Sequence, residues 1–411
     1  MINQENKHSW CVNAEHAMSG DNTGETKVCC MTRFMGRDHS IGRETIQENF
    51  NQPDFLELRE ALQNGVRHEF CKLCWEEEDA GRKSKRLRDN DKYLGMLKAG
   101  EKPFDGLAKI ELNLGNQCNL KCRTCGPHSS STWLKERFDR QEAENYPEGG
   151  FKDYVKTMRK FSKYYEPDSM FWQDFWDNLH TIRQMDFYGG EPFMSEEMWS
   201  TLRKAADLGY AKDIELHYAT NCTQWPEDKI EVFKEFKHLN LNFSIDGVYN
   251  GKSDGFNYTR FPGNWKDAEV TLRKAEKFAE THHDCHLSWI ITLSTINIYS
   301  LPDIIEEYEK KYSKSFNIYL NLVHSPEYYN INIIPEAIKQ EVVERLESIP
   351  KEYFVWTNYL PGVIQFIKNG KENLDLWKRA MQEIKFSDNY RNQKFKKVYP
   401  EYYDLIKRKM G

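Results

Sequence analysis

The chain has 411 residues, a mean hydropathy of −0.81 and a formal net charge of −6 at pH 7, which excludes an overall attraction to nucleic acid. No apolar run approaches the roughly 20 residues that cross a bilayer, so we expect no membrane partner. The first residues, MINQENKHSWCVN, lack the basic start and apolar core of a secretory signal, and we expect a cytoplasmic location.

The first segment, residues 1–105, is rich in cysteine and poor in long apolar runs. Its cysteines are Cys11, Cys29, Cys30, Cys71 and Cys74. Disulfides are rare in the cytosol, so these thiols indicate metal binding or catalysis, and a bound metal would compensate for the small core. The sequence therefore predicts a small cysteine-rich domain over 1–105 that ends in a polar linker.

The middle segment, residues 106–330, alternates short β-like runs with stretches of helical spacing. The β-like runs lie at 108–115, 182–190, 213–221, 239–247, 286–295 and 316–324. This βα alternation predicts an α/β fold with a parallel sheet, either an open doubly wound sheet or an incomplete barrel. Residues 331–411 have helical patterns and predict a helical C-terminal extension.

Residues that carry chemistry follow several of these runs. Chemistry in parallel α/β folds lies at the carboxyl ends of the strands. The residues found at or just after such ends are Cys118, Cys122, Cys125, Gly189, Gly190, Glu191, Asn221 and Ser244. The sequence thus predicts one site that is built from several strand ends.

The spacing of Cys118, Cys122 and Cys125 is C-x3-C-x2-C, with no fourth cysteine beside it. Three thiolates would hold three irons of a four-iron cluster and leave the fourth iron free for a substrate or cofactor. A zinc site with a distant fourth ligand and fortuitous core cysteines remain the alternatives, because zinc and iron–sulfur sites share such spacings.

Four motifs together resemble the radical S-adenosylmethionine (SAM) superfamily. They are CNLKCRTC, FYGGEP, ATNCT and SIDG, and the resemblance covers about residues 108–325. It implies a partial (β/α)6 TIM-like barrel and a catalytic [4Fe-4S] cluster held by the three cysteines of the array. Two positions depart from the common pattern: Thr124 stands where an aromatic residue is usual, and Cys222 stands where glycine is usual in TNGT.

The same resemblance implies roles for the residues that would bind SAM. Gly189, Gly190 and Glu191 would receive the methionine amino group, which a carboxylate complements. Ser244 and Arg260 resemble the pair that contacts the SAM carboxylate and ribose in the peptide-modifying branch. Asn221 and Asn297 stand where the family often lines the ribose and adenine side.

The first segment resembles the auxiliary-cluster domains called SPASM or twitch, here placed before the barrel. The resemblance implies a second [4Fe-4S] cluster, held by Cys11, either Cys29 or Cys30, Cys71 and Cys74. A structural zinc site with the same ligands remains the alternative, since spacing does not separate the two metals.

Together these resemblances imply a radical SAM enzyme, an oxidoreductase that cleaves SAM to a 5′-deoxyadenosyl radical and abstracts hydrogen from a peptide or protein. An electron donor such as flavodoxin or ferredoxin is the implied partner. Modification of a nucleotide or nucleic acid base is the alternative, supported by the basic, aromatic residues 394–409. A non-catalytic iron–sulfur or zinc scaffold is a third reading.

Overall fold

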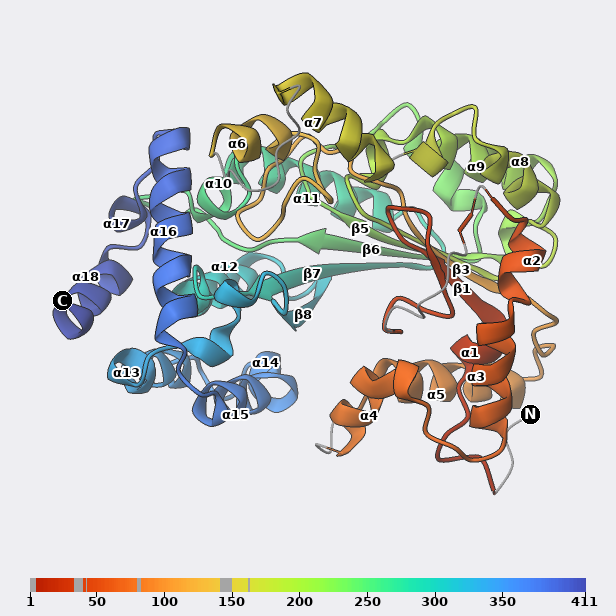
Figure 1. The fold of residues 1–411 in the computed structure, drawn as a ribbon, viewed down its shortest axis with the longest axis horizontal. Coiled ribbons are helices and arrows are strands. Elements are labelled where there is room, and N and C mark those ends of the chain that lie inside the picture. Colours follow the sequence, from red (N-terminus) through yellow and green to blue (C-terminus); the bar gives the residue numbers. More distant parts are fainter. Residues whose placement is uncertain (1–4, 33–39, 42, 80–82, 141–149, 162) are drawn as a thin grey trace. The chain divides into compact units, whose positions relative to one another are not determined.

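The strands of the sheet follow one another in nearly the order of the chain. The computed structural model describes residues 5–32, 40–41, 43–79, 83–140, 150–161 and 163–411. Within them the strand order is β2-β1-β3-β4-β5-β6-β7-β8 (Figure 1). The strands are β1 (Ala17–Gly20), β2 (Thr26–Lys27), β3 (Lys109–Asn113), β4 (Gln184–Tyr188), β5 (Glu215–Thr220), β6 (His238–Ser244), β7 (Cys285–Leu293) and β8 (Phe316–Leu322).

Strands β3 to β8 are the six strands that the sequence predicted. They keep the order of the chain, without the reversal that marks a doubly wound sheet. The pairings β1–β3, β3–β4, β4–β5 and β7–β8 are parallel, whereas β1 and β2 pair antiparallel. The expected α/β class with a mostly parallel sheet is confirmed.

The chain divides into two compact units. The first unit comprises Met1–Gln117, Lys156–Tyr218 and Glu227–Leu239. The second unit comprises Cys118–Val155, Ala219–Pro226 and Asn240–Gly411. The three-cysteine array and the five early cysteines therefore belong to different units.

The first unit builds its part of the sheet from strands with two unlike faces. Its helices are α1 (Val12–His16), α2 (Ile46–Phe50), α3 (Pro53–Gln63), α4 (Lys72–Asp79), α5 (Lys85–Lys98), α8 (Met170–Asp177) and α9 (Glu196–Asp207). Because side chains alternate along a strand, Met185 and Phe187 of β4 are buried while Asp186 between them is half-buried. Across the strands, the register aligns Glu111 with Asp186, which gives the sheet a polar face.

The apolar face of these strands carries an aromatic core. Tyr218 of β5 stacks on Phe187 with a centroid separation of 5.3 Å and packs on Phe233 at 5.1 Å. Trp199 of α9 lies 5.3 Å from Phe233. Helix α9 begins where the Ser195 hydroxyl accepts from the Met198 amide, and this cap fixes the helix over the core.

Strands β1 and β2 were not predicted. They contain four and two residues, which is too short for an alternating pattern to be recognised. Pairing with β3 stabilises β1, with Ser19 opposite Glu111. The early segment thus contributes a strand to the sheet.

The second unit contains β7, β8 and most of the later helices. The helices are α6 (Trp133–Asp139), α10 (Gly255–Thr259), α11 (Trp265–Ala279), α12 (Leu301–Lys311), α13 (Glu336–Glu347), α14 (Phe354–Asn358), α15 (Leu360–Asn369), α16 (Leu374–Arg391), α17 (Phe395–Val398) and α18 (Pro400–Met410). Helix α7 (Gly150–Met158) spans the boundary between the units. In the core, Trp289 of β7 lies 4.8 Å from Tyr312 and 5.7 Å from Trp265 of α11, between ring centroids.

The C-terminal residues form helices, as the sequence predicted for 331–411, and α13 to α18 are drawn in blue in Figure 1. Three of the four aromatic side chains of the basic tail, Phe395, Tyr399 and Tyr402, are buried, and the fourth, Tyr403, is half-buried. Tyr402 stacks on Tyr299 with a centroid separation of 5.0 Å. These rings therefore pack in the core of the second unit and do not offer an open surface for nucleic acid bases.

Among the described residues, no helix has both the length and the apolar character that a membrane crossing requires.

Candidate functional site

The three cysteines of the C-x3-C-x2-C array lie on one loop of the second unit. Two backbone hydrogen bonds hold this loop: the Lys121 amide donates to the Phe261 carbonyl over 2.7 Å, and the Arg123 amide donates to the Thr259 carbonyl over 2.9 Å. Lys121 and Arg123 flank Cys122, so its backbone is fixed from both sides. We call residues 118–125 the three-cysteine loop.

Two pairs of thiols in this loop lie close together. Cys118 and Cys122 are buried and pack with Leu120 in one cluster, whereas Cys125 is exposed. The hydrogen bond between Cys122 and Cys125 raises the pKa of the Cys122 thiol and lowers that of Cys125.

Nitrogen donors point at the sulfurs. The Leu120 amide donates to the Cys118 sulfur over 3.4 Å, and the Asn221 side-chain amide donates to the same sulfur over 3.7 Å. Arg260 Nη1 donates to the Cys122 sulfur over 3.8 Å. Hydrogen bonds and charge of this kind favour the thiolate form, which is the form that binds metal.

Arg260 is a buried cation, and one of its hydrogen-bond donors has no partner among the described residues. It follows α10, and its Nη2 pairs with Asp246 Oδ2 at 2.7 Å. Burial lowers the pKa of Arg260. The negative charges of Asp246, Cys122 and Cys125 raise it by more, so the net shift is upward. The Nε atom of Arg260 is buried and has no hydrogen-bond partner among the described residues. An anionic oxygen placed there would satisfy this donor, as the carboxylate of SAM would.

The Gly-Gly-Glu segment follows β4 in the first unit, and the surroundings of its two glycines leave no room for a side chain. Gly189 and Gly190 have φ values of 77° and 53°, which favour glycine. A Cβ on Gly190 would lie 2.4 Å from the Gln117 carbonyl oxygen, and one on Gly189 would lie 1.6 Å from Asn113 Oδ1. The Glu191 amide donates to the Gln117 carbonyl over 2.8 Å. The segment therefore lies against the residue that immediately precedes Cys118.

Glu191 itself is 2% exposed, and its carboxylate accepts from the Phe193 amide over 3.3 Å. A carboxylate at this position complements a cationic group such as an ammonium. Close by, Asn113 Oδ1 is buried without a hydrogen-bond partner among the described residues. This acceptor is a second polar atom that a ligand donor would satisfy.

The remaining residues expected near SAM lie in the second unit and differ in their hydrogen bonds and burial. Asn221 contacts the Cys118 sulfur and donates to Asn119 Oδ1 over 2.7 Å. Ser244 is the half-buried last residue of β6. Asn297 is 1% exposed, donates to the carbonyls of Asp246 and Thr292, and accepts from the Ser294 amide. Its polar atoms hold the ends of β6 and β7 in place.

Cys222, the departure from glycine in the ATNCT motif, adopts the backbone conformation that glycine favours. Its φ is 66° and its side chain is fully buried. The sulfur lies 3.5 Å from the Ala268 carbonyl, to which the thiol donates. The turn therefore keeps the shape that the motif requires while a small thiol fills the space behind it.

The first unit brings together four of its five early cysteines. Cys11, Cys29, Cys71 and Cys74 line one small cavity. Burial, together with the neighbouring thiols, raises the pKa of Cys11 to about 12 and the pKa of Cys71 also lies above its ordinary value. Burial, reinforced by Glu111, raises the pKa of Cys29 to about 11. We call these residues the four-thiol pocket.

Cys30 is absent from the lining of the four-thiol pocket. Its amide donates to Glu111 Oε2 over 2.6 Å, and Glu111 pairs with Lys85 at 3.0 Å. Burial and Glu111 raise the pKa of the Cys30 thiol. The structure therefore brings Cys29, and not Cys30, together with the other three thiols.

Lys85 and Arg86 of α5 also line the four-thiol pocket. Arg86 is held by Glu78 and donates from Nη1 to the Trp10 carbonyl over 2.7 Å. Across the part of the chain that the structure describes, no group of three or more His, Cys, Asp or Glu side chains forms a ready-made site for a metal ion.

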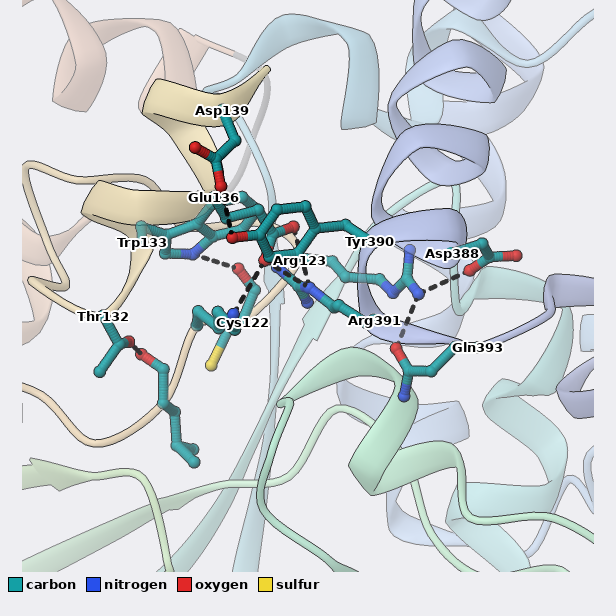
Figure 2. Close-up of polar contacts among 12 residues, drawn as sticks. Cys122, Arg123, Thr132, Trp133, Glu136, Asp139, Asp388, Tyr390, Arg391 and Gln393 are labelled. Carbon is teal, nitrogen blue, oxygen red and sulfur yellow. Dashed lines mark hydrogen bonds and ion pairs between the residues drawn. The ribbon is translucent and has the colours of Figure 1, made fainter. Parts of the chain in front are cut away.

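Several residues at the three-cysteine loop were missed by the sequence analysis, and Figure 2 labels all of them except Asp246. They are Asp246, Arg123, Trp133, Glu136, Asp388 and Arg391. Asp246 lies within the SIDG motif and its acidic character was a signal. The contact between Arg391 and Glu136 joins residues that are 255 positions apart, and no local pattern could have found it.

No family model matches this sequence, and neither does any curated protein sequence. Solved structures that resemble the chain include SuiB of Streptococcus suis bound to S-adenosylmethionine, with 13% identity, a TM-score of 0.33 and coverage of 64% of this chain and 49% of that one. SuiB bound to the precursor peptide SuiA has 14% identity, a TM-score of 0.34 and coverage of 73% and 62%. The protein anSMEcpe with bound AdoMet has 16% identity, a TM-score of 0.36 and coverage of 62% of each chain.

The radical SAM methyltransferase TsrM of Kitasatospora setae, with cobalamin and a [4Fe-4S] cluster bound, is a further match at 10% identity and a TM-score of 0.33. That match covers 53% of this chain and 34% of TsrM. Thus the chain spans less than two thirds of the length of each of these four structures.

Proposed function

We propose that the chain is a radical SAM enzyme and that the three-cysteine loop holds its catalytic [4Fe-4S] cluster. One observation carries this proposal: the three cysteines lie close together in neighbouring pairs on a loop whose preceding residue, Gln117, is contacted by the Gly190–Glu191 backbone. Three thiolates suit a cluster with one open iron. Figure 2 draws the contacts that support the loop from behind.

When bound, the cluster would supply the electron that splits SAM into methionine and a 5′-deoxyadenosyl radical, which abstracts hydrogen from the substrate. The residues of this chain would bind and orient SAM. The Arg260 Nε donor and the Asp246–Arg260 pair suit the SAM carboxylate. Glu191 suits the amino group, and Ser244 and Asn221 would line the ribose and adenine side. Asn297 would act by holding the strand ends.

We propose further that the four-thiol pocket holds a second cluster, with Cys11, Cys29, Cys71 and Cys74 as ligands. Four sulfur donors in a small cavity suit a [4Fe-4S] cluster or zinc, and none of the described residues that line it is a histidine or a carboxylate. Full ligation would close this site to substrate, so its role would be electron transfer or folding. In this proposal residues 1–105 form the auxiliary part, 106–330 the catalytic part and 331–411 a helical support.

The substrate that we propose is a peptide or protein. The motifs resemble the peptide-modifying branch, and a solved structure that resembles this chain is described as bound to a precursor peptide. The alternative, a nucleic acid base, depended on the aromatic residues of the C-terminal tail, and Phe395, Tyr399 and Tyr402 are buried. A flavodoxin or ferredoxin would deliver the electron.

The proposal is tested by anaerobic reconstitution with iron and sulfide, followed by dithionite and SAM. We expect about eight irons per chain if both sites fill with four-iron clusters, and release of 5′-deoxyadenosine that is measured by chromatography and mass spectrometry. A protein that binds zinc and no sulfide at the three-cysteine loop, or that releases no 5′-deoxyadenosine, would contradict the enzyme proposal. Incubation with a cellular peptide and nucleic acid pool would then identify the substrate by its change in mass.

A further inference from the structure

The C-terminal end of helix α16 delivers three side chains to the back of the three-cysteine loop (Figure 2). Arg123 of the loop donates from Nη2 to Asp388 at 2.7 Å and to Gln393 at 2.9 Å. Asn392 ends the helix in the left-handed conformation, with φ of 53°, and so turns the chain toward Gln393. The third side chain is Arg391, the last residue of the helix.

Arg391 is enclosed between the loop and helix α6. Its Nε donates to both carboxylate oxygens of Glu136 at 3.0 Å, and both side chains are 0% exposed. Its guanidinium lies 4.6 Å from the centre of the Trp133 ring, and Trp133 Nε1 donates to the Cys122 carbonyl over 3.0 Å. Only one side chain thus stands between Arg391 and the backbone of a predicted cluster ligand.

The charges around Arg391 do not balance among themselves. Glu136 also pairs with Lys121, at 3.1 Å, so one buried carboxylate serves two cations. The Nη1 and Nη2 atoms of Arg391 are buried and have no hydrogen-bond partner among the described residues. Burial lowers the pKa of Arg391, whereas Glu136 and, more weakly, Cys122 raise it. A buried cation with unused donors is costly unless a further negative charge lies close to it.

A cluster held by three thiolates would provide that charge. Each one-electron reduction adds a negative charge to the cluster, and nearby buried cations stabilise the reduced state more than the oxidised state. Net charge, hydrogen bonding to sulfur and solvent exposure are the levers by which proteins set cluster potentials. Arg123 is largely neutralised by Asp388, so the uncompensated charge on this side of the loop is that of the Lys121–Glu136–Arg391 group.

We propose that Arg391 is a positioning residue that braces the three-cysteine loop through Glu136 and Trp133 and whose charge favours the reduced state of the cluster. The inference rests on the proposed function, because the loop must carry a cluster. It assigns to the helical C-terminal part a role in tuning the redox chemistry of the loop. Glu136 is then expected to act in the opposite direction, since removing its charge leaves two cations uncompensated.

The test is a redox titration of the reconstituted protein, followed by electron paramagnetic resonance, in four variants. Arg391→Gln is expected to disfavour reduction about tenfold, which is about 59 mV for a one-electron couple. Glu136→Gln is expected to favour reduction by a similar factor. The double variant Arg391→Gln/Glu136→Gln restores the net charge and should lie near the wild type. Lys378→Gln, on the same helix with a side chain that is 72% exposed, is the matched control and should not shift the potential.

The inference is overturned if the two single variants leave the potential unchanged or shift it in the same direction. A common shift would mean that both disturb the loop geometry without an effect of charge. If Arg391→Gln does not fold, Arg391→Lys replaces it: it keeps the charge and must retain the potential while Glu136→Gln raises it. Failure of the proposed function is separate, because the Cys71→Ala variant, in which the four-thiol pocket is disrupted, would then show no [4Fe-4S] signal from the three-cysteine loop.

Discussion

The three-cysteine loop and the four-thiol pocket differ in number of donors and in what surrounds them. The loop has three thiols, one of them exposed, and donors from Arg260 and Asn221 point at its sulfurs. The pocket has four thiols in a small cavity, and burial raises the pKa of Cys11 and Cys29. Three donors leave one iron of a cluster open to a ligand, whereas four close it.

The surroundings of the two thiol groups match this difference. Around the loop, Arg260 Nε is a buried donor that lacks an acceptor among the described residues, so the site is incomplete without a ligand. Around the pocket, Arg86 is fully engaged by Glu78 and the Trp10 carbonyl. The two proposed sites therefore differ in the engagement of their buried arginines as well as in the number of their thiols.

Removing a thiol from the loop should have the largest effect. Cys122→Ala removes one of three ligands, so we expect 5′-deoxyadenosine release to fall to the level of the iron-free protein. Cys222→Ala is the matched control, because Cys222 is equally buried but its thiol donates to the Ala268 carbonyl. Chromatography of the quenched reaction measures both. Activity that survived in Cys122→Ala would contradict the assignment of the loop.

Removing a thiol from the pocket should halve the iron content. Cys71→Ala is expected to lower iron from about eight to about four atoms per chain, because one four-iron cluster is lost. Cys30→Ala should leave the iron content unchanged, since Cys30 lies beside Glu111 and outside the pocket. Metal analysis with sulfide determination checks both. Equal losses in the two variants would show that the pocket does not discriminate between the adjacent cysteines.

A methyl group on the glycine turn should weaken SAM binding. Gly190→Ala places a Cβ 2.4 Å from the Gln117 carbonyl at a φ of 53°, so the residue before Cys118 must move. Gly106→Ala has a similar φ, 59°, with no atom within 4 Å of the new Cβ. The control should cost about 1 kcal/mol of stability from the backbone alone. Gly190→Ala should cost more and should lower SAM affinity, as calorimetry would measure. Equal effects would mean that contact with Gln117 is unimportant.

Much of the fold could be predicted because its signals are local. The runs at 108–115 and 316–324 became β3 and β8, since alternation and bounding turns are properties of a few neighbouring residues. The motifs at strand ends were visible for the same reason. The strand β1 was not predicted because its four residues are stabilised by pairing with β3, and the sequence of a strand does not reveal its pairing partner.

The sequence predicted the cysteines of the candidate site but not the residues that hold them in place. Sequence left Cys29 and Cys30 equivalent, because adjacent residues share their spacing to every other cysteine. The fold separates them by turning one toward the four-thiol pocket and the other toward Glu111. Arg391 could not be found at all, since its partner Glu136 lies 255 positions away and no periodic pattern links the two.

The smallest effect that we predict concerns Trp133, which links Arg391 to the loop. Trp133→Phe keeps a ring under the guanidinium but removes the 3.0 Å hydrogen bond from Nε1 to the Cys122 carbonyl. Loss of that bond leaves a buried acceptor unpaired, which should cost about 1 to 2 kcal/mol in the free energy of unfolding. Trp176→Phe is the control of equal size, because its Nε1 donates to the Thr201 hydroxyl of the first unit. Chemical denaturation measures both costs. Of these two tryptophans, only Trp133 contacts the three-cysteine loop. A chelator should therefore remove iron from this loop faster in Trp133→Phe and not in Trp176→Phe. Equal rates of removal would show that the Trp133 hydrogen bond does not brace the loop.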